Sequence, residues 1–150
     1  MIRARPGDSR VLPPAIVVTS LDAAEAALAP GLAVTLLSLP GAALSMGAPW
    51  WRALIATATD AFPATAMTDV IDCAASPGAA LAALRAGAKR LVLAPETQAQ
   101  AVIARAAAEC GAELLACRPP ALSLPSDPFS PRARALIAAW LMTEDPRPMR

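Results

Sequence analysis

Five short apolar runs alternate along this chain with segments that favour helices, and this alternation constrains the fold more than any other feature. The runs are rich in valine, isoleucine and leucine, and they cover residues 15–19, 33–38, 67–73, 91–93 and 114–117. Strands that alternate with helices usually form parallel sheets joined by right-handed crossovers. Runs that are apolar on both faces also suit a covered parallel sheet. The sequence therefore predicts an α/β domain with a five-stranded, mainly parallel sheet.

Two architectures fit this pattern. One is an open, doubly wound sheet flanked by helices, and the other is a partial (βα) barrel. Five strands cannot close an eight-stranded barrel without a partner, so we expect the open sheet. Residues 1–14 should form a flexible N-terminal arm, residues 15–142 a single domain, and residues 143–150 a polar tail. A chain of this length buries roughly 68–70% of its unfolded surface, which is enough for a core.

Capping residues mark several of the expected helix starts. Ser20, Ser76 and Ser130 each stand where an N-cap is favoured, and the last two are followed by proline. Thr97 and Gln100 fit the spacing of a capping box. Two segments lack such signals. We expect residues 39–48 to be a glycine- and proline-rich loop and residues 118–129 to be a polyproline-like strap.

Composition excludes several classes of protein. The net charge is +1, which gives no field to attract nucleic acid. A long stretch without charges lies between Glu25 and Arg52, but Pro–Gly pairs divide it into pieces too short to span a bilayer. The three cysteines include no close pair, so we expect reduced thiols and a cytoplasmic location. No metal or cofactor motif is present, and we expect no cofactor.

Polar residues should converge at the carboxyl ends of the strands, where ligands of parallel sheets usually bind. Ser38, Asp72 and Arg118 follow or end three of the apolar runs, so we expect them to share one rim of the sheet. The loop between Gly41 and Gly47 leads to a helix start, where backbone amides can face an anion. It lacks the Gly-Lys-Ser/Thr ending of a phosphate-binding P-loop. These five residues are the candidate binding site.

Asp72 allows two interpretations. An acidic residue at the end of a buried strand can serve as a base, bind a cation or hold a sugar hydroxyl. The alternative is a local role, in which Asp72 accepts hydrogen bonds from the backbone of residues 74–76. Cys73, its neighbour, has no histidine to activate it, because the chain contains none. We therefore assign no catalytic residue.

Trp50 and Trp51 are the candidate interface residues. Adjacent residues on a helix point about 100° apart, so both indoles can hardly enter the same core pocket. One should pack on the sheet while the other stays near the surface and offers a contact to a partner. The alternative is that both lie flat beneath the loop of residues 39–48.

A local resemblance covers about a quarter of the chain. In the segment from Ser76 to Leu93, the sequence Ala-Leu-Arg-Ala-Gly-Ala at 83–88 precedes a short apolar run. It is similar to helix–strand units of phosphate-binding (βα)8 barrels and of response-regulator-like domains. Extended through Thr97, it resembles small class I aldolases of the barrel type. Their Schiff-base lysine is absent, since Lys89 precedes its strand, so the resemblance implies architecture alone. The whole chain also resembles short α/β proteins of GC-rich bacteria, which implies no activity.

Three hypotheses of function follow. The first is a non-catalytic α/β domain that acts by self-association, as a homodimer, or by binding a protein partner. The second is binding or turnover of a small anionic metabolite at the carboxyl ends of the strands. The third is a degenerate fragment of a barrel enzyme whose sheet edges join in a homodimer.

Overall fold

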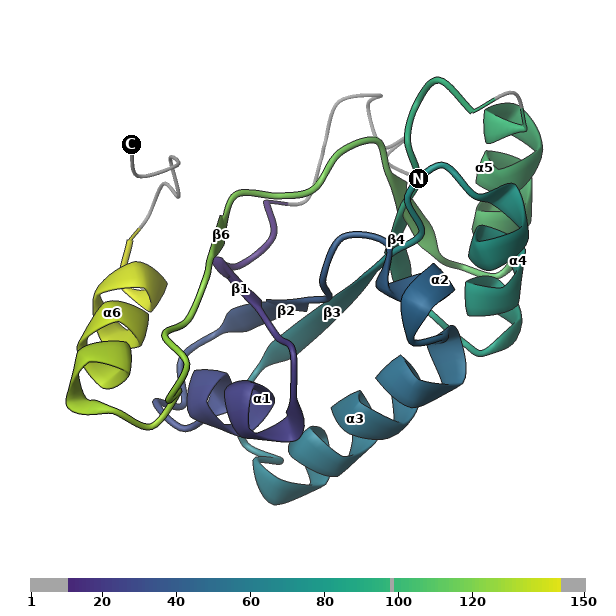
Figure 1. Ribbon diagram of the computed structural model, residues 1–150. Coiled ribbons are helices and arrows are strands. Elements are labelled where there is room, and N and C mark those ends of the chain that lie inside the picture. The colour runs from purple at the N-terminus through teal and green to yellow at the C-terminus, as the bar shows by residue number, and fades with distance from the viewer. Residues whose placement is uncertain (1–10, 98, 144–150) are drawn as a thin grey trace, which may run out of the picture.

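A parallel sheet of six strands forms the centre of the computed structural model, which describes residues 11–97 and 99–143 (Figure 1). The strands are β1 (Ala15–Val17), β2 (Val34–Leu37), β3 (Met67–Asp72), β4 (Arg90–Val92), β5 (Glu113–Leu115) and β6 (Ala121–Leu122). The helices are α1 (Leu21–Leu28), α2 (Ala42–Ser45), α3 (Ala48–Ala61), α4 (Pro77–Arg85), α5 (Gln100–Glu109) and α6 (Pro131–Leu141). The predicted parallel α/β sheet flanked by helices is confirmed. The predicted number of five strands is wrong.

The sixth strand and one short helix lie in segments that we expected to be irregular. β6 falls within the proline-rich stretch of residues 118–129, and α2 falls within the loop of residues 39–48. β6 has only two residues and no apolar run of its own, so no local pattern indicates it. It is a strand because it pairs with β1, with Ala15 opposite Ala121 and Ile16 opposite Leu122.

The strand order explains where the helices lie. The order is β5-β4-β3-β2-β1-β6, and all neighbouring pairs are parallel. From β1 to β5 each new strand is added on the same side, so right-handed crossovers place the intervening helices on one face. The next strand, β6, returns to the other side of β1. The direction of strand addition therefore reverses between β1 and β6.

The two faces of the sheet have different cores. Alternate residues of a strand point to opposite faces. Leu36 and Ile71 belong to the main cluster, which also contains buried residues of α1, α3, α4, α5 and α6. Leu37 and Val70, one position away, belong to a small second cluster that contains no residue of the described helices. The helices thus cover one face, and the opposite face carries its own apolar lining.

The sheet must curl for the chain to connect β5 to β6. Five interstrand spacings of about 4.8 Å separate these strands along the sheet, or about 24 Å. The chain between Leu115 and Ala121 has six Cα–Cα steps, which reach at most about 21 Å when fully extended. In Figure 1 the longer helices lie in an arc, from α6 at the left, through α1 and α3 below, to α4 and α5 at the right. The segment that enters β6 crosses the remaining side.

The expected N-caps at three helix starts are confirmed. The hydroxyl oxygens of Ser20, Ser76 and Ser130 each accept a hydrogen bond from the backbone N–H three residues later. The expected capping box is wrong, because α5 begins at Gln100 after the N-cap Ala99. Turn hydrogen bonds occupy this segment instead, with the N–H of Thr97 donating to Ala94 and that of Gln100 donating to Thr97.

The expected arm and tail fall mostly outside the described residues, which omit 1–10 and 144–150. Within the described part, contacts begin before β1. The Thr35 hydroxyl donates to the carbonyl of Pro13 at 2.8 Å, and the Thr35 N–H donates to that of Pro14 at 3.0 Å. None of the helices in the described ranges is long and apolar enough to cross a bilayer.

Candidate functional site

Three of the predicted site residues meet at the carboxyl ends of the strands. Ser38 directly follows β2, and Asp72 ends the adjacent strand β3. The Asp72 N–H donates to the Ser38 hydroxyl oxygen at 2.9 Å, and that hydroxyl donates to the carbonyl of Leu39 at 3.1 Å. Arg118 reaches the same point from beyond β5, where its Nη1 lies 2.9 Å from Asp72 Oδ2. The expected convergence of these residues at one rim is confirmed.

The Asp72 carboxylate is held by three donors. Its Oδ1 accepts from the N–H of Gly41 at 3.0 Å and from that of Ala74 at 2.8 Å, and Arg118 holds Oδ2. Asp72 is 4% exposed, so this charge is satisfied within the fold. The hydrogen bond from the Ala74 N–H is the local role that the sequence offered as the alternative interpretation of Asp72.

The Asp72 carboxylate joins three stretches of chain. Gly41 belongs to the segment after β2, Ala74 to the segment after β3, and Arg118 to the crossover from β5 to β6. Ala74 has a φ of +50°, in the left-handed region that disfavours residues other than glycine. Its N–H bond to Asp72 and the bond from the Ala94 N–H to its carbonyl, at 2.8 Å, hold it there.

Gly47 is not part of this network. It precedes α3 as the N-cap, with a φ of +89°, and its N–H donates to the carbonyl of Ala42. Gly47 thus ends α2 and starts α3. The structure brings together Ser38, Gly41, Asp72 and Arg118, while Gly47 serves the helix junction.

The two tryptophans separate as the helical geometry predicts. Trp51 is fully buried, and its indole N–H donates to Asp69 Oδ2 at 3.2 Å. Trp50 is partly buried and packs against the main cluster. Its ring centroid lies 6.5 Å from that of Trp51. The Trp51 side chain is enclosed within the chain, so of this pair only Trp50 reaches the surface.

Asp69 and Cys73 lie on the face of the sheet that the helices cover, where Asp69 contacts Trp51 and Cys73 belongs to the main cluster. Burial raises the pKa of the Asp69 carboxyl, although the Trp51 hydrogen bond and the Arg52 charge oppose this. Burial, together with the neighbouring charge of Asp72, raises the pKa of the Cys73 thiol to about 12. The thiol therefore stays protonated near neutral pH and is no nucleophile.

A cavity opens beside the network, where the strand order reverses. It has a volume of about 290 Å³ and lies at the carboxyl ends of β1 and β6. Its walls come from three segments: the end of β1 with the start of α1, the residue after Ser38, and the stretch after β6. The lining residues are Val17, Thr19, Ser20, Ala23, Leu39, Ser123, Leu124, Pro125, Ser126 and Pro128. We call this cavity the switch-point pocket.

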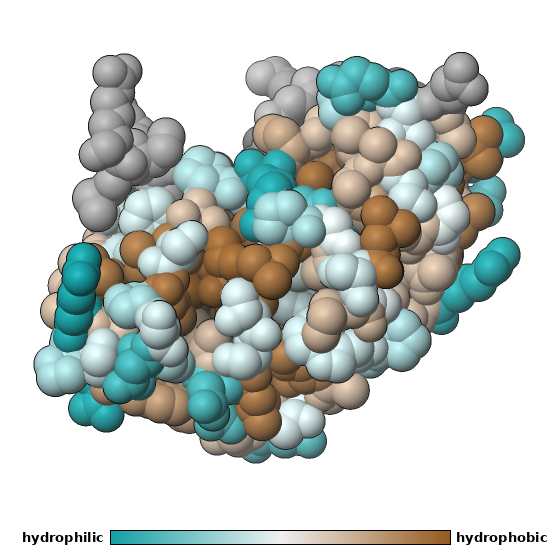
Figure 2. Space-filling view, viewed as in Figure 1, coloured by the Kyte–Doolittle hydropathy of each residue, from teal (hydrophilic) through white to brown (hydrophobic). Residues whose placement is uncertain are grey.

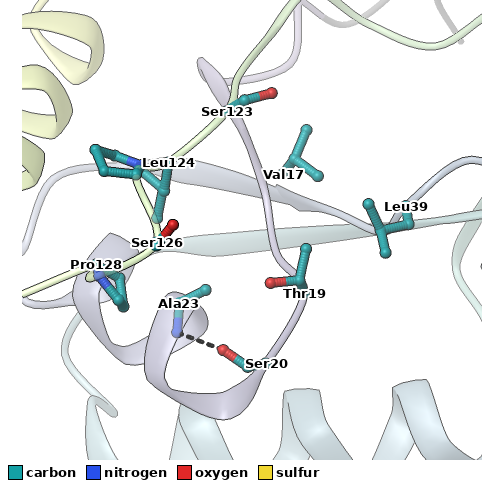
Figure 3. A pocket seen from close by; sticks show the side chains of 10 residues that line it. Val17, Thr19, Ser20, Ala23, Leu39, Ser123, Leu124, Ser126 and Pro128 are labelled. Atoms are coloured by element: carbon teal, nitrogen blue, oxygen red, sulfur yellow. Dashed lines mark hydrogen bonds between the residues drawn. The ribbon is translucent and has the colours of Figure 1, made fainter.

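The lining of the switch-point pocket combines hydroxyl groups with apolar side chains. Figure 3 shows the Thr19 hydroxyl turned toward the stretch after β6, where Ser126 lies on the facing wall. Leu39 bounds the pocket on the far side from Leu124. The Ser20 hydroxyl is already engaged, since it accepts from the Ala23 N–H at 3.2 Å. Among the residues that the structure describes, no ionisable side chain lines this pocket.

The hydrogen-bond network around Asp72 fixes two walls of this pocket. The carbonyl of Leu39 accepts from the Ser38 hydroxyl and from the Ala42 N–H, so the backbone that carries the Leu39 side chain is anchored. Arg118 anchors the crossover that leads into β6, which in turn carries Ser123 and the residues after it. The pocket is therefore formed before any ligand binds.

A second cavity, of about 400 Å³, lies between α1 and α6. Its lining is apolar except for one charged side chain, and comprises Ala26, Ala29, Pro30, Pro128, Phe129, Arg134 and Ile137. It lies away from the carboxyl ends of the central strands. The switch-point pocket is the stronger candidate site, because polar groups from several distant segments converge there.

Sequence reasoning identified only part of the switch-point pocket. Thr19 ends the first apolar run and Ser20 follows it, so both were predictable from the sequence as residues at the carboxyl end of a strand. Ser123 and Ser126 were not, because they lie in the stretch that we expected to be a strap. The only available signal was the pattern Ser-Leu-Pro-Ser-Asp-Pro at 123–128, which also describes an ordinary loop.

Comparisons with known proteins add no family. The chain matches no family model, and no curated protein is significantly similar to it. Within residues 11–97 and 99–143, no group of three or more His, Cys, Asp or Glu side chains is placed to hold a metal ion.

Proposed function

We propose that this domain binds a small molecule in the switch-point pocket without catalysing a reaction on it. The observation that carries the proposal is the position of a preformed, hydroxyl-lined cavity at the reversal of strand order. In open α/β sheets, ligands bind outside the carboxyl ends of the strands at that point. Binding is favoured over turnover because, among the described residues, no carboxylate, lysine or histidine side chain lines the pocket to activate its hydroxyls.

We also infer that the fold belongs with the partial (βα) barrel rather than with the doubly wound sheet. The single main cluster beneath the helices supports this, as does the apolar lining of the opposite face. The pairing of the last strand with the first, in parallel, is how a (βα) barrel closes. Barrel proteins also place their ligands at the carboxyl ends of the strands, so both versions of the fold point to the same pocket.

A variant that fills the pocket tests the proposal. Ser123 is exposed, lines the pocket and makes no hydrogen bond within the described residues, so Ser123→Phe should occupy the cavity without unfolding the domain. Thr57→Phe, on the exposed surface of α3, is the matched control. A small-molecule fragment library is screened by saturation-transfer NMR. Fragments that bind the wild type should lose their signal with Ser123→Phe and keep it with Thr57→Phe. The proposal fails when no fragment binds the wild type, or when the fragments that bind the wild type bind Ser123→Phe equally well.

Self-association is a second candidate, supported by exposed apolar side chains after β2. Leu44 is 60% exposed and Met46 is 49% exposed, and Leu39 beside them is also exposed. Figure 2 shows apolar surface over β1 and β2 and again beside α2 on this face. Exposed apolar surface that gathers in one place marks contact sites. We infer that the exposed side chains of Leu39, Leu44 and Met46 form the contact of a homodimer.

Sedimentation velocity over micromolar to millimolar concentrations tests this second candidate. The wild type should sediment as a dimer at the upper end, and the double variant Leu44→Ser, Met46→Ser should remain monomeric. Val102→Ser removes an equally exposed apolar side chain from α5 and should leave the dimer intact. A wild type that stays monomeric throughout would rule out the homodimer.

A further inference from the structure

The lining of the switch-point pocket also restricts which molecules fit it. We infer that the pocket takes an uncharged, polyhydroxylated ring of monosaccharide or nucleoside size. This inference rests on the proposed function, because it names the class of ligand for that same pocket. It differs from the anionic ligand that the sequence alone suggested.

The lining of the pocket sets hydroxyl groups in an apolar surface. A hydroxyl both donates and accepts hydrogen bonds, so Thr19, Ser123 and Ser126 match the hydroxyl groups of a sugar in either sense. The apolar surfaces of Leu39 and Leu124 suit the C–H face of such a ring. Specificity in ligand pockets comes from a few polar groups set in an apolar lining, and this pocket has that composition.

The segments that line the pocket carry acidic residues but no free cation among the described residues. Asp22 lies between the lining residues Ser20 and Ala23, and Asp127 lies between Ser126 and Pro128. Neither carboxylate forms an ion pair within the described residues. The guanidinium of Arg118 is paired with Asp72 and adds little net field. Arg134 lines the neighbouring cavity rather than this one. Two acidic residues in the lining segments, and no cation among the described lining residues, disfavour a phosphate or carboxylate.

The volume of the pocket limits the size of the ligand. Ligand pockets usually measure about 300–1,000 Å³, and this pocket, at about 290 Å³, is at the small end of that range. A dinucleotide or a long acyl chain would extend well beyond the walls. A single ring with its hydroxyl groups, or a ring joined to a sugar, matches the space.

Matched pairs of neutral and phosphorylated compounds test the inference. The probes are adenosine, uridine and ribose, each compared with its 5′-monophosphate, and glucose, compared with its 6-phosphate. Affinities are measured by ligand-observed NMR titration and by competition within each pair. We expect at least one neutral compound to bind, and its phosphate to bind roughly fivefold more weakly or worse, because the described lining offers no cation to pair with the phosphate while two carboxylates lie in the same segments.

Variants of the lining locate the binding. Thr19→Val and Ser126→Ala should each weaken binding of the neutral compound by about fivefold, since each removes one hydrogen bond of about 1 kcal/mol. Ser45→Ala, which alters an exposed hydroxyl on α2, should leave it unchanged.

Each other outcome has a defined meaning. If a phosphorylated compound binds as tightly as its neutral partner, and Ser123→Phe abolishes that binding, the inferred ligand class is wrong but the proposed function stands. Absence of binding by all four neutral compounds also overturns the ligand class. The fragment screen then decides the proposed function independently.

Discussion

Removal of the Asp72 carboxylate should destabilise the domain more than any other single change at the carboxyl ends of the strands. The carboxylate accepts from the Gly41 N–H, the Ala74 N–H and Arg118, at 2.8–3.0 Å. In Asp72→Ala, both backbone donors lose their partner and the Arg118 charge is left unpaired. Hydrogen bonds to charged groups contribute about 1.5–3 kcal/mol each, but the variant also relieves the cost of burying the carboxylate. We expect a net loss of about 3–4 kcal/mol in the free energy of unfolding.

Substitution of Arg118 separates the contribution of the ion pair to the free energy of unfolding from that of the two backbone hydrogen bonds. Arg118→Met leaves Asp72 with its two N–H donors, and the Arg118 side chain is already 27% exposed. This change should lower the free energy of unfolding by about 1–2 kcal/mol, below the range for breaking a fully buried pair. The double variant Asp72→Ala, Arg118→Met should then lose less than the sum of the two single changes. The difference, about 1 kcal/mol, measures the direct coupling of the pair.

Urea denaturation followed by tryptophan fluorescence gives these free energies, provided that the transitions are two-state. Glu113→Gln is the control, because it breaks the partly exposed pair with Arg90 at the other end of the sheet. Such surface pairs contribute about 0–1 kcal/mol. The reasoning is refuted if Asp72→Ala costs no more than Glu113→Gln, or if the effects of Asp72→Ala and Arg118→Met simply add.

Three further predictions concern single residues. Burial raises the pKa of the Asp69 carboxyl above its ordinary 3.8, so the folded state binds this proton more tightly than the unfolded state does. The free energy of unfolding of the wild type, relative to that of Asp69→Asn, should therefore fall as the pH rises from about 3.8 through the raised pKa. Urea titrations between about pH 3.5 and 7 check this, and parallel curves for the two proteins would contradict it. Iodoacetamide should label the exposed Cys110 and Cys117 in the native protein and Cys73 only after unfolding, as mass spectrometry of peptides will show, since Cys73 is buried and its pKa is about 12. Ala74→Gly should raise the free energy of unfolding by about 0.5–1 kcal/mol, because glycine tolerates the φ of +50° found there; a loss in urea denaturation would disprove the strain.

The convergence of Ser38 and Asp72 was predictable because it depends on local order alone. The two residues end consecutive strands, and consecutive parallel strands of this type are usually neighbours with their carboxyl ends at one edge. The position of Arg118 depends on more. β5 lies two strands from β3, and Arg118 reaches Asp72 from the crossover that leaves β5. The charge pairing of an otherwise buried carboxylate favoured this contact.

The reversal of strand order was not predictable from local patterns. β6 has two residues, Ala121 and Leu122, which show neither alternation nor a β-branched run. Its pairing with β1 joins residues more than a hundred positions apart, and no composition signal encodes such a contact. Because β6 positions Ser123 and Ser126, half of the switch-point pocket was hidden in a segment that reads as a loop.

The start of α5 shows how a correct motif can fail. Thr97 and Gln100 have the spacing of a capping box, yet the helix begins at Gln100 itself. Consecutive turns after β4 use the N–H groups of both residues, and this places Thr97 outside the helix. The motif matches two residues of the sequence, whereas the geometry of the preceding strand decides where the first helical turn lies.

The pairing of the last strand with the first has a consequence for how the protein is made. During synthesis, β1 emerges first and gains β2 within about twenty residues, but its second edge stays open until residues 121–122 leave the ribosome. The indole of Trp140 then donates to the carbonyl of Ala15 at 2.7 Å, which fastens the final helix to the earliest strand. Release of an incomplete chain would therefore leave β1 as an unpaired edge of the sheet, the kind of edge that recruits other chains.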